Sequence, residues 1–124
     1  MGEIATDRVH APIDPDRVAH EVASAGDRWV QADHAAKLLE KTEKIVFAQL
    51  VRDLRRGEVT LSRRDAEDAA LVSETYQSHV YAMTEARREA NLARVAWEAA
   101  RARFEAMRTA EASRRAEMTA FGRR

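Results

Sequence analysis

Arginine is the residue type whose positions in this chain suggest binding chemistry. The first group, Arg55, Arg56, Arg63 and Arg64, flanks Gly57. A guanidinium group stays charged, and its planar fork of donors fits carboxylate and phosphate oxygens. Four of them around one turn predict a compact basic patch that contacts an anion or a nucleic acid. Alternatively, these side chains only stabilise a helix C-terminus and keep the turn soluble.

A second group of arginines recurs every seven residues in the C-terminal half of the chain. Its members are Arg87, Arg94, Arg101, Arg108 and Arg115. Glutamates three or four residues away, such as Glu98 and Glu105, could pair with them on a solvated helix face. The same stripe could instead meet an acidic partner helix. It could also contact nucleic acid, although the glutamates interrupt its positive field.

Patterns for catalysis and metal binding are missing from the sequence. The histidines His10, His20, His34 and His79 form no His-x-x-x-His pair, and none lies three residues after a glutamate. The chain has no cysteine and no glycine-rich phosphate loop, so neither thiolate chemistry nor a nucleotide cradle is expected. We therefore expect no enzymatic activity, no metal and no cofactor. His79 is predicted to be a half-buried, hydrogen-bonded histidine.

The elements that carry these residues are predicted to be helices. Residues 58–121 contain neither glycine nor proline and are rich in Ala, Arg and Glu. This pattern predicts one helix over about 63–121, and at about 1.5 Å per residue such a helix is roughly 90 Å long. A compact domain of this size has a radius of gyration of only about 14 Å. The chain is therefore expected to be a rod, a long hairpin or part of an oligomer.

Two shorter helices are predicted before the long one. Asp14 and Pro15 are typical of a helix start, as N-cap and first helical residue. Gly26 is expected to separate a helix over about 15–25 from one over about 27–56. The alternative is one helix that continues through Gly26 with a kink.

The links between helices predict the fold class. Gly57 is expected to end the second helix, and Ser62 with Asp65 to form a capping box for the third. Helices joined by a short link are antiparallel neighbours. We predict an all-α fold, namely an elongated, coiled-coil-like antiparallel hairpin in one domain over residues 14–124. Residues 1–13 are expected to be disordered or loosely attached.

The predicted long helix carries an apolar seam with the heptad repeat of a coiled coil. The seam residues predicted to form an oligomer interface are Tyr76, Met83, Ala90, Ala93, Trp97, Ala100, Phe104 and Met107. The earlier helices are long enough to cover this seam to about residue 104 at best. Trp97, Phe104, Met107, Met118 and Phe121 are therefore expected to lie partly or wholly beyond intrachain cover.

The charge distribution predicts how two copies would pair. Residues 1–86 hold 11 Lys/Arg and 16 Asp/Glu, a sum of −5, whereas residues 87–124 hold 10 Arg and 5 Glu, a sum of +5. Antiparallel pairing about Ala90–Ala93 would place each acidic third of the long helix against the other copy's arginine-rich third. We therefore favour an antiparallel homodimer.

The remaining features bear on compartment. No segment approaches the roughly 20 apolar residues of a membrane helix. The N-terminus lacks the basic and apolar regions of a signal peptide. We expect a cytoplasmic protein without membrane contact.

A resemblance extends the functional expectation. Residues 85–95 (Glu-Ala-Arg-Arg-Glu-Ala-Asn-Leu-Ala-Arg-Val), followed by 108–111 and 114–118, resemble small helical proteins of tailed phages and prophages. The resemblance covers roughly residues 27–118 and brings no catalytic residue with it. It implies an accessory role among phage recombination and replication functions, or in countering host defence. We expect a non-enzymatic helical adaptor with a protein or nucleic-acid partner. The alternatives are an inhibitor of a host defence protein and a purely structural coiled-coil scaffold.

Overall fold

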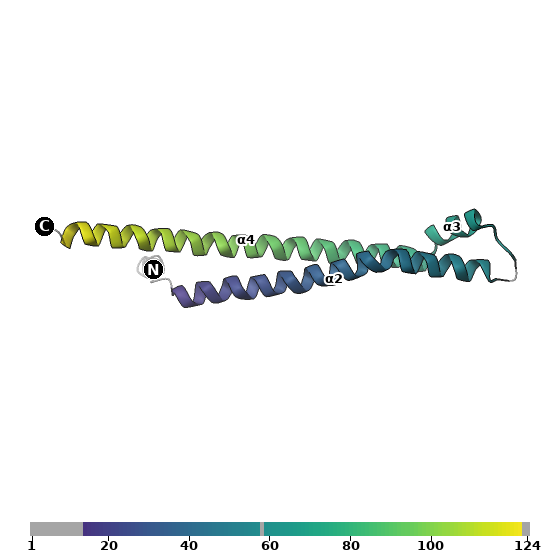
Figure 1. The fold of residues 1–124 in the computed structure, drawn as a ribbon, viewed down its shortest axis with the longest axis horizontal. Helices are drawn as coiled ribbons and strands as arrows, with labels where there is room; N and C mark the ends of the chain where they lie inside the picture. Colours follow the sequence, from purple (N-terminus) through teal and green to yellow (C-terminus); the bar gives the residue numbers. More distant parts are fainter. Residues whose placement is uncertain (1–13, 58, 123–124) are drawn as a thin grey trace, which may run out of the picture. The chain divides into compact units, whose positions relative to one another are not determined.

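The computed structural model describes residues 14–57 and 59–122, and most of these residues lie in helices and none in a strand. The helices are α2 (Pro15–Arg55), α3 (Arg63–Leu71) and α4 (Glu74–Gly122) (Figure 1). The all-α prediction is confirmed. The prediction of disorder over residues 1–13 lies outside the described residues. The chain divides into two compact units, whose described parts are residues 14–26 with 95–122, here called the first unit, and Asp27–Arg94, the second unit.

Helix α2 starts where the sequence predicts. The backbone N–H of Asp16 donates to Oδ1 of Asp14 at 3.0 Å, and the N–H of Val18 donates to the Asp14 carbonyl at 3.2 Å. Asp14 is thus the N-cap, and Pro15 occupies the first helical position, where it has no hydrogen bond to lose.

The predicted division of this helix at Gly26 is wrong, because α2 runs without interruption from Pro15 to Arg55. A Cβ atom on Gly26 would lie 3.2 Å from Nε1 and 3.3 Å from Cδ1 of Trp97, on the facing part of α4 in the first unit. Glycine costs about 1 kcal/mol relative to alanine inside a helix. The close approach of the indole offsets that cost, so Gly26 here is a packing residue and not a helix end.

The predicted single helix over 63–121 is also wrong, because it is divided at Val72 and Ser73 into α3 and α4. The hydroxyl of Ser73 donates to the Ala70 carbonyl at 2.7 Å and accepts the N–H of Tyr76 at 3.2 Å. One side chain thus satisfies the end of α3 and caps the start of α4. Gln77 Nε2 donates to the Leu71 carbonyl at 2.8 Å. Side-chain capping therefore breaks the helix without glycine or proline.

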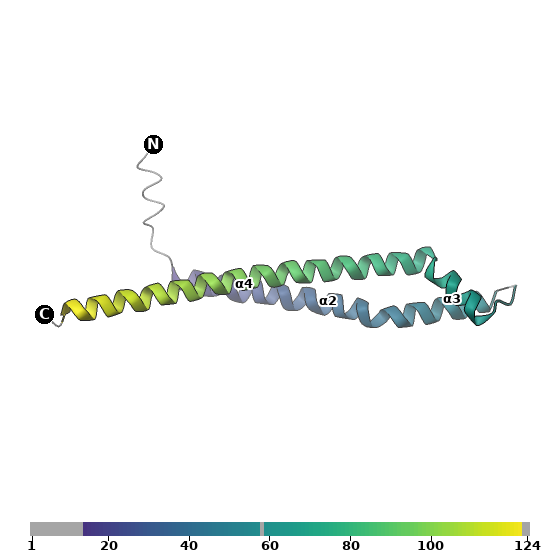
Figure 2. The ribbon, with the colours of Figure 1, turned by 90° about the horizontal axis from the view of Figure 1, so that it is seen from above.

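In the second unit, α2 and α4 run antiparallel (Figure 2). Tyr76 Oη donates to Glu43 Oε1 at 2.7 Å, and His79 Nε2 lies 2.9 Å from the Leu39 carbonyl, to which it must donate. The prediction for His79 is confirmed. The fully buried residues are alanines, Ala36, Ala66, Ala70 and Ala90, so the helices of this unit approach closely over small side chains.

In the first unit, the cover that α2 gives to α4 extends further than predicted. Val18 lines a hollow with Met107 and Ala110, and Pro15 lines another that extends along α4 to Arg115. Trp97, Phe104 and Met107 are accordingly half-buried. Met118 and Phe121 are 69% and 77% exposed, as expected for residues beyond the start of α2.

We expect the substitution Ser73→Ala to destabilise the protein by about 1 kcal/mol, the usual effect of losing an N-cap. The substitution removes both side-chain hydrogen bonds that end α3 and start α4. Urea unfolding followed by circular dichroism measures the difference. Ser78→Ala, at an exposed position of α4, is the matched control. Equal stability of the two variants would show that the cap contributes nothing.

Candidate functional site

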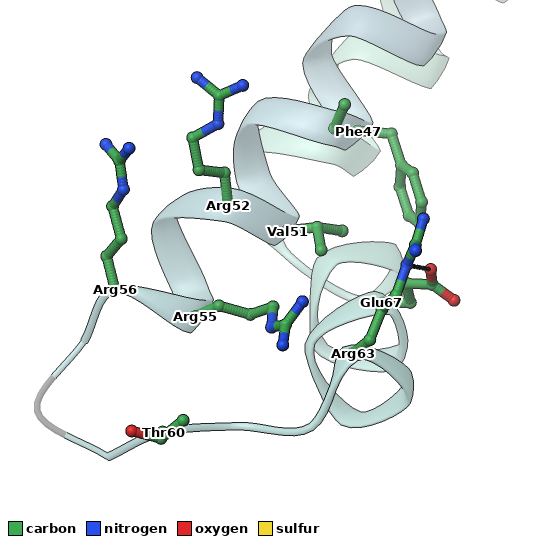
Figure 3. Close-up of a pocket in the computed structure, with 9 residues that line it drawn as sticks. Phe47, Val51, Arg52, Arg55, Arg56, Thr60, Arg63 and Glu67 are labelled. Atoms are coloured by element: carbon green, nitrogen blue, oxygen red, sulfur yellow. Dashed lines mark hydrogen bonds and ion pairs between the residues drawn. The ribbon is translucent and has the colours of Figure 1, made fainter.

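A hollow in the second unit lies where the C-terminal end of α2 meets the start of α3 (Figure 3). Its volume is about 520 Å³, within the range of small-ligand and side-chain pockets. Phe47, Ala48 and Val51 of α2 form an apolar floor. Charged and polar side chains from the end of α2, the link and α3 also line the hollow. In Figure 3 the Arg55 side chain points towards α3, whereas the guanidinium ends of Arg52 and Arg56 point away from Phe47. We call this hollow the basic groove.

Three of the four arginines predicted for this turn line the basic groove. Arg55 and Arg56 come from the end of α2 and Arg63 from the first turn of α3, whereas Arg64 is not among the lining residues. Arg52, one turn earlier on α2, is a fourth lining arginine that the sequence analysis missed. Its three- and four-residue spacing to Arg55 and Arg56 is the signal that could have found it.

Local structure explains how these side chains come together. Arg52 and Arg55 lie in the last turn of α2, and Arg56 follows that turn directly, with its backbone N–H bonded to the Arg52 carbonyl at 3.2 Å. Ser62 then caps α3 by accepting the N–H of Asp65 at 3.1 Å, which is one of the two bonds of the predicted capping box. Ala66 and Ala70 are fully buried, so α3 can lie close to its neighbours. The direction of α3 thereby brings Arg63 to the same hollow.

The arginines of the basic groove differ in whether they form an ion pair. Arg63 Nε lies 3.2 Å from Glu67 Oε1, an ion pair within α3 that keeps one arginine occupied (Figure 3). Within residues 14–57 and 59–122, no hydrogen bond or ion pair holds the side chains of Arg52, Arg55 or Arg56. The guanidinium groups of these three lining arginines therefore have donors available for an anion.

The first member of the seven-residue arginine stripe is paired within the chain. Arg87 of α4 reaches across to α2 in the second unit, where it bonds Asp33 Oδ1 at 2.8 Å and pairs with Glu40. Hydrogen bonds to Glu40, and then to Asp33, raise the pKa of the Arg87 guanidinium. The acidic helix that this arginine meets thus belongs to the same chain.

The other members of the stripe lie in different surroundings. The guanidinium carbon of Arg101 lies 4.7 Å from the centre of the Trp97 ring, and that of Arg108 lies 5.9 Å from the centre of the Phe104 ring. These are cation–π contacts between residues four apart, which pack the arginine stems over the seam aromatics. Arg94 is exposed and engaged in an interaction, and Arg115 lines a shallow hollow beside Phe104.

The residues predicted as an oligomer interface lie on the buried side of α4. In the second unit these are Tyr76, Met83, Ala90 and Ala93, and in the first unit Trp97, Ala100, Phe104 and Met107. The heptad therefore identified the correct face of the helix. The contacts to Glu43 and Gly26 show that α2 covers this face, at Tyr76 and at Trp97 respectively. An interface between copies stays a prediction.

Other polar clusters serve packing. Tyr76 also sets its ring edge-on to Phe47, with centroids 5.6 Å apart, and its bond to Glu43 raises the pKa of the Tyr76 phenol. Across residues 14–57 and 59–122, no group of three or more His, Asp or Glu residues is arranged to hold a metal ion. In the same part of the chain, no helix is long and apolar enough to span a bilayer.

No protein-family model, no curated protein and no solved structure matches this chain.

Asp33 supports a prediction about pH. Hydrogen bonds from Lys37, and then from Arg87, lower the pKa of the Asp33 carboxyl in the folded protein. A lowered folded-state pKa contributes stability above the unfolded-state value of about 3.9, and this contribution is lost as the pH falls through the folded-state value. We expect Asp33→Asn to melt lower than the parent at pH 7, with a gap that narrows towards pH 3.

Thermal melting at the two pH values checks this expectation. The control is Asp53→Asn, an exposed aspartate of the same helix, for which the gap should be small at both values. A gap for Asp33→Asn that stays constant between pH 7 and pH 3 would contradict the role of the Asp33 carboxylate.

Proposed function

We propose that this protein is a non-enzymatic helical adaptor that binds an anionic macromolecular partner at the basic groove. The observation that carries the proposal is the set of Arg52, Arg55 and Arg56 beside an apolar floor, without side-chain partners among the described residues. Packing or solubility would not require three cations to line one hollow. The resemblance to phage helical proteins extends the proposal to an accessory role in phage DNA recombination or replication. A role as inhibitor of a host defence protein would use the same groove.

A structural scaffold is the second candidate. It is favoured by Arg87, which forms an ion pair with Asp33 of α2, and by Arg101, which stacks on Trp97 of its own helix. A scaffold of this kind would self-associate, as the predicted antiparallel dimer does. It would not need the arginines of the basic groove.

The test is affinity capture from a bacterial lysate, with and without nuclease, using the parent and the Arg52→Gln/Arg55→Gln/Arg56→Gln variant. We expect the parent to capture a partner, and the variant to capture at least tenfold less of it. The reason is that charge-assisted bonds to arginine are among the stronger polar contacts. Nuclease-sensitive capture supports the DNA role, and one stoichiometric protein supports the inhibitor role.

The matched control removes three arginines elsewhere, through Arg17→Gln, Arg64→Gln and Arg88→Gln, all at exposed positions. This control should capture as the parent does. If the parent and both variants retain the same material, or none, the groove has no partner, and the scaffold explains the protein better.

A further inference from the structure

The basic groove combines two chemistries in one hollow. Its floor is apolar, and the ring of Phe47 in that floor is held edge-on by Tyr76. Its rim carries Arg52, Arg55 and Arg56, with Thr60 from the link (Figure 3). A hollow of about 520 Å³ with a preformed apolar wall accepts a large side chain at low ordering cost. A ligand that satisfies both parts needs an apolar anchor and at least one anionic group.

The positively charged surface is small, and this limits the length of an anionic ligand. Residues 47–71, which contain the groove and α3, hold five arginines and five acidic residues, so this segment is neutral as a whole. Asp65, Glu67 and Asp68 lie on α3 beside the arginines. A duplex or long single strand gains affinity with each phosphate that is neutralised. Such a polyanion would meet several carboxylates within one or two turns of the groove. A ligand with two or three charges covers less of this segment, and the carboxylate that lines the groove, Glu67, is paired with Arg63.

The chemistry of the floor argues against a duplex, whose sugar–phosphate backbone presents no large apolar group to Phe47 and Val51. The unpaired bases of a single strand do stack on aromatic rings, so a single strand is disfavoured by the carboxylates of α3 and not by the floor. Carboxylates spaced along a peptide can accept the paired donors of a guanidinium, while a neighbouring Leu, Phe or Trp side chain fills the hollow. We propose that the basic groove binds a short acidic peptide segment of a partner protein, with one large apolar side chain seated on Phe47 and Val51. This assignment rests on the proposed function and narrows its partner to a peptide.

The test is a yeast-displayed library of random twelve-residue peptides, selected on the purified full chain. A parallel selection uses the Arg55→Gln/Arg56→Gln variant. We expect the parent to enrich peptides with two or more Asp or Glu residues near a Leu, Phe or Trp, and the variant not to enrich them. Binding of an enriched peptide, measured by fluorescence anisotropy, should fall at least tenfold with the variant. The Arg64→Gln/Arg88→Gln control has the same net charge as the variant but leaves the groove lining intact, and it should bind within twofold of the parent.

Two chemically altered peptides and two nucleic acids complete the comparison. Replacing the acids of an enriched peptide by Asn and Gln, or its apolar residues by Ser, should each weaken binding at least tenfold. A 20-nucleotide oligo(dT) and a 20-base-pair duplex should bind more weakly than the enriched peptide at 150 mM salt. Enrichment without acidic residues, or enrichment that the variant shares, overturns the peptide assignment.

Failure of the peptide assignment and failure of the proposed function give different results. Tighter binding of oligo(dT) or duplex, lost in the Arg55→Gln/Arg56→Gln variant, overturns the peptide assignment but keeps an anionic partner at the groove. If neither peptides nor nucleic acids bind the parent more tightly than the variant, the peptide assignment and the proposed function are both overturned. Circular dichroism of each variant separates loss of binding from loss of helix.

Discussion

The variant Trp97→Ala is expected to lose about 2 kcal/mol of stability without a change in oligomeric state. Truncating a fully buried tryptophan to alanine costs about 3–5 kcal/mol of stability. Truncating a half-buried tryptophan should cost less. In the first unit the indole lies against Gly26 of α2, and Arg101 stacks on its ring at 4.7 Å. Alanine would remove both contacts. For a chain of this size the loss corresponds to roughly 10 °C in melting temperature.

Thermal melting and light scattering on the same samples test this expectation. Trp29→Ala, at a half-buried position of α2 in the second unit, shows how much of the effect is common to tryptophan truncation. Phe104→Ala should behave like Trp97→Ala, because Phe104 also lies on the half-buried seam of the first unit. If both seam variants dissociate an oligomer while the monomer melts unchanged, the seam serves an interface between copies.

The Gly26 side of the contact gives an independent check. Gly26→Ala would gain about 1 kcal/mol of helix propensity, but its Cβ would meet the indole at 3.2 Å, closer than ordinary van der Waals contact. We expect these effects nearly to cancel. Gly26→Leu adds bulk that the indole cannot accommodate without moving, so it should destabilise by about 1–3 kcal/mol. A stabilising Gly26→Leu would show that Trp97 does not pack there.

The parts of the fold that the sequence predicts depend on local interactions. Asp14 with Pro15 and Ser62 with Asp65 are caps whose hydrogen bonds join residues two or three apart, and the structure contains both starts. The seam was predicted for a similar reason, since the heptad repeat is a property of one helix. It specifies which face is apolar but not which helix covers it. Here the covering helix is α2 of the same chain.

The parts that sequence analysis missed depend on contacts made over longer distances or on competing local bonds. Gly26 is a helix breaker by propensity, and only the contact with Trp97, 71 positions later, explains why α2 continues. Ser73 lies in a stretch without glycine or proline, yet its hydroxyl competes with the helix for the Ala70 carbonyl. The pair Ser73–Glu74, a capping residue followed by an acid, was the available signal.

The basic groove was partly predictable for the same physical reasons. Arg55, Arg56 and Arg63 were identified because they are close in sequence to one turn. The apolar floor was not, because Phe47 and Val51 become a floor only when α3 lies beside α2. Arg64, equally close in sequence, does not line the groove. The direction of successive side chains on a helix differs by about 100°, so nearness along the chain does not place neighbours in one site.

The variant Arg87→Glu is expected to destabilise the protein strongly. The Arg87 side chain is 33% exposed and lies between Asp33 and Glu40, which are 24% and 39% exposed. A glutamate there would place three carboxylates together where water screens them only in part. Removing one partner of a shielded pair is worse than removing both, because the remaining charges lose their compensation. The melting temperature should fall by several degrees more than for Arg88→Glu.

Arg88→Glu is the matched control because Arg88 is the next residue and its side chain is 67% exposed. Among the described residues its one ion pair is a long contact of 3.8 Å with Glu85. Combining Arg87→Glu with Glu40→Lys should restore part of the lost stability, since it exchanges the charges of one pair. Differential scanning calorimetry of the single and double variants gives the coupling between the two positions. If Arg87→Glu melts no lower than Arg88→Glu, the contact with α2 contributes nothing. If Arg87→Glu leaves the melting temperature unchanged but abolishes salt-sensitive binding to DNA or RNA, the arginine stripe binds nucleic acid instead.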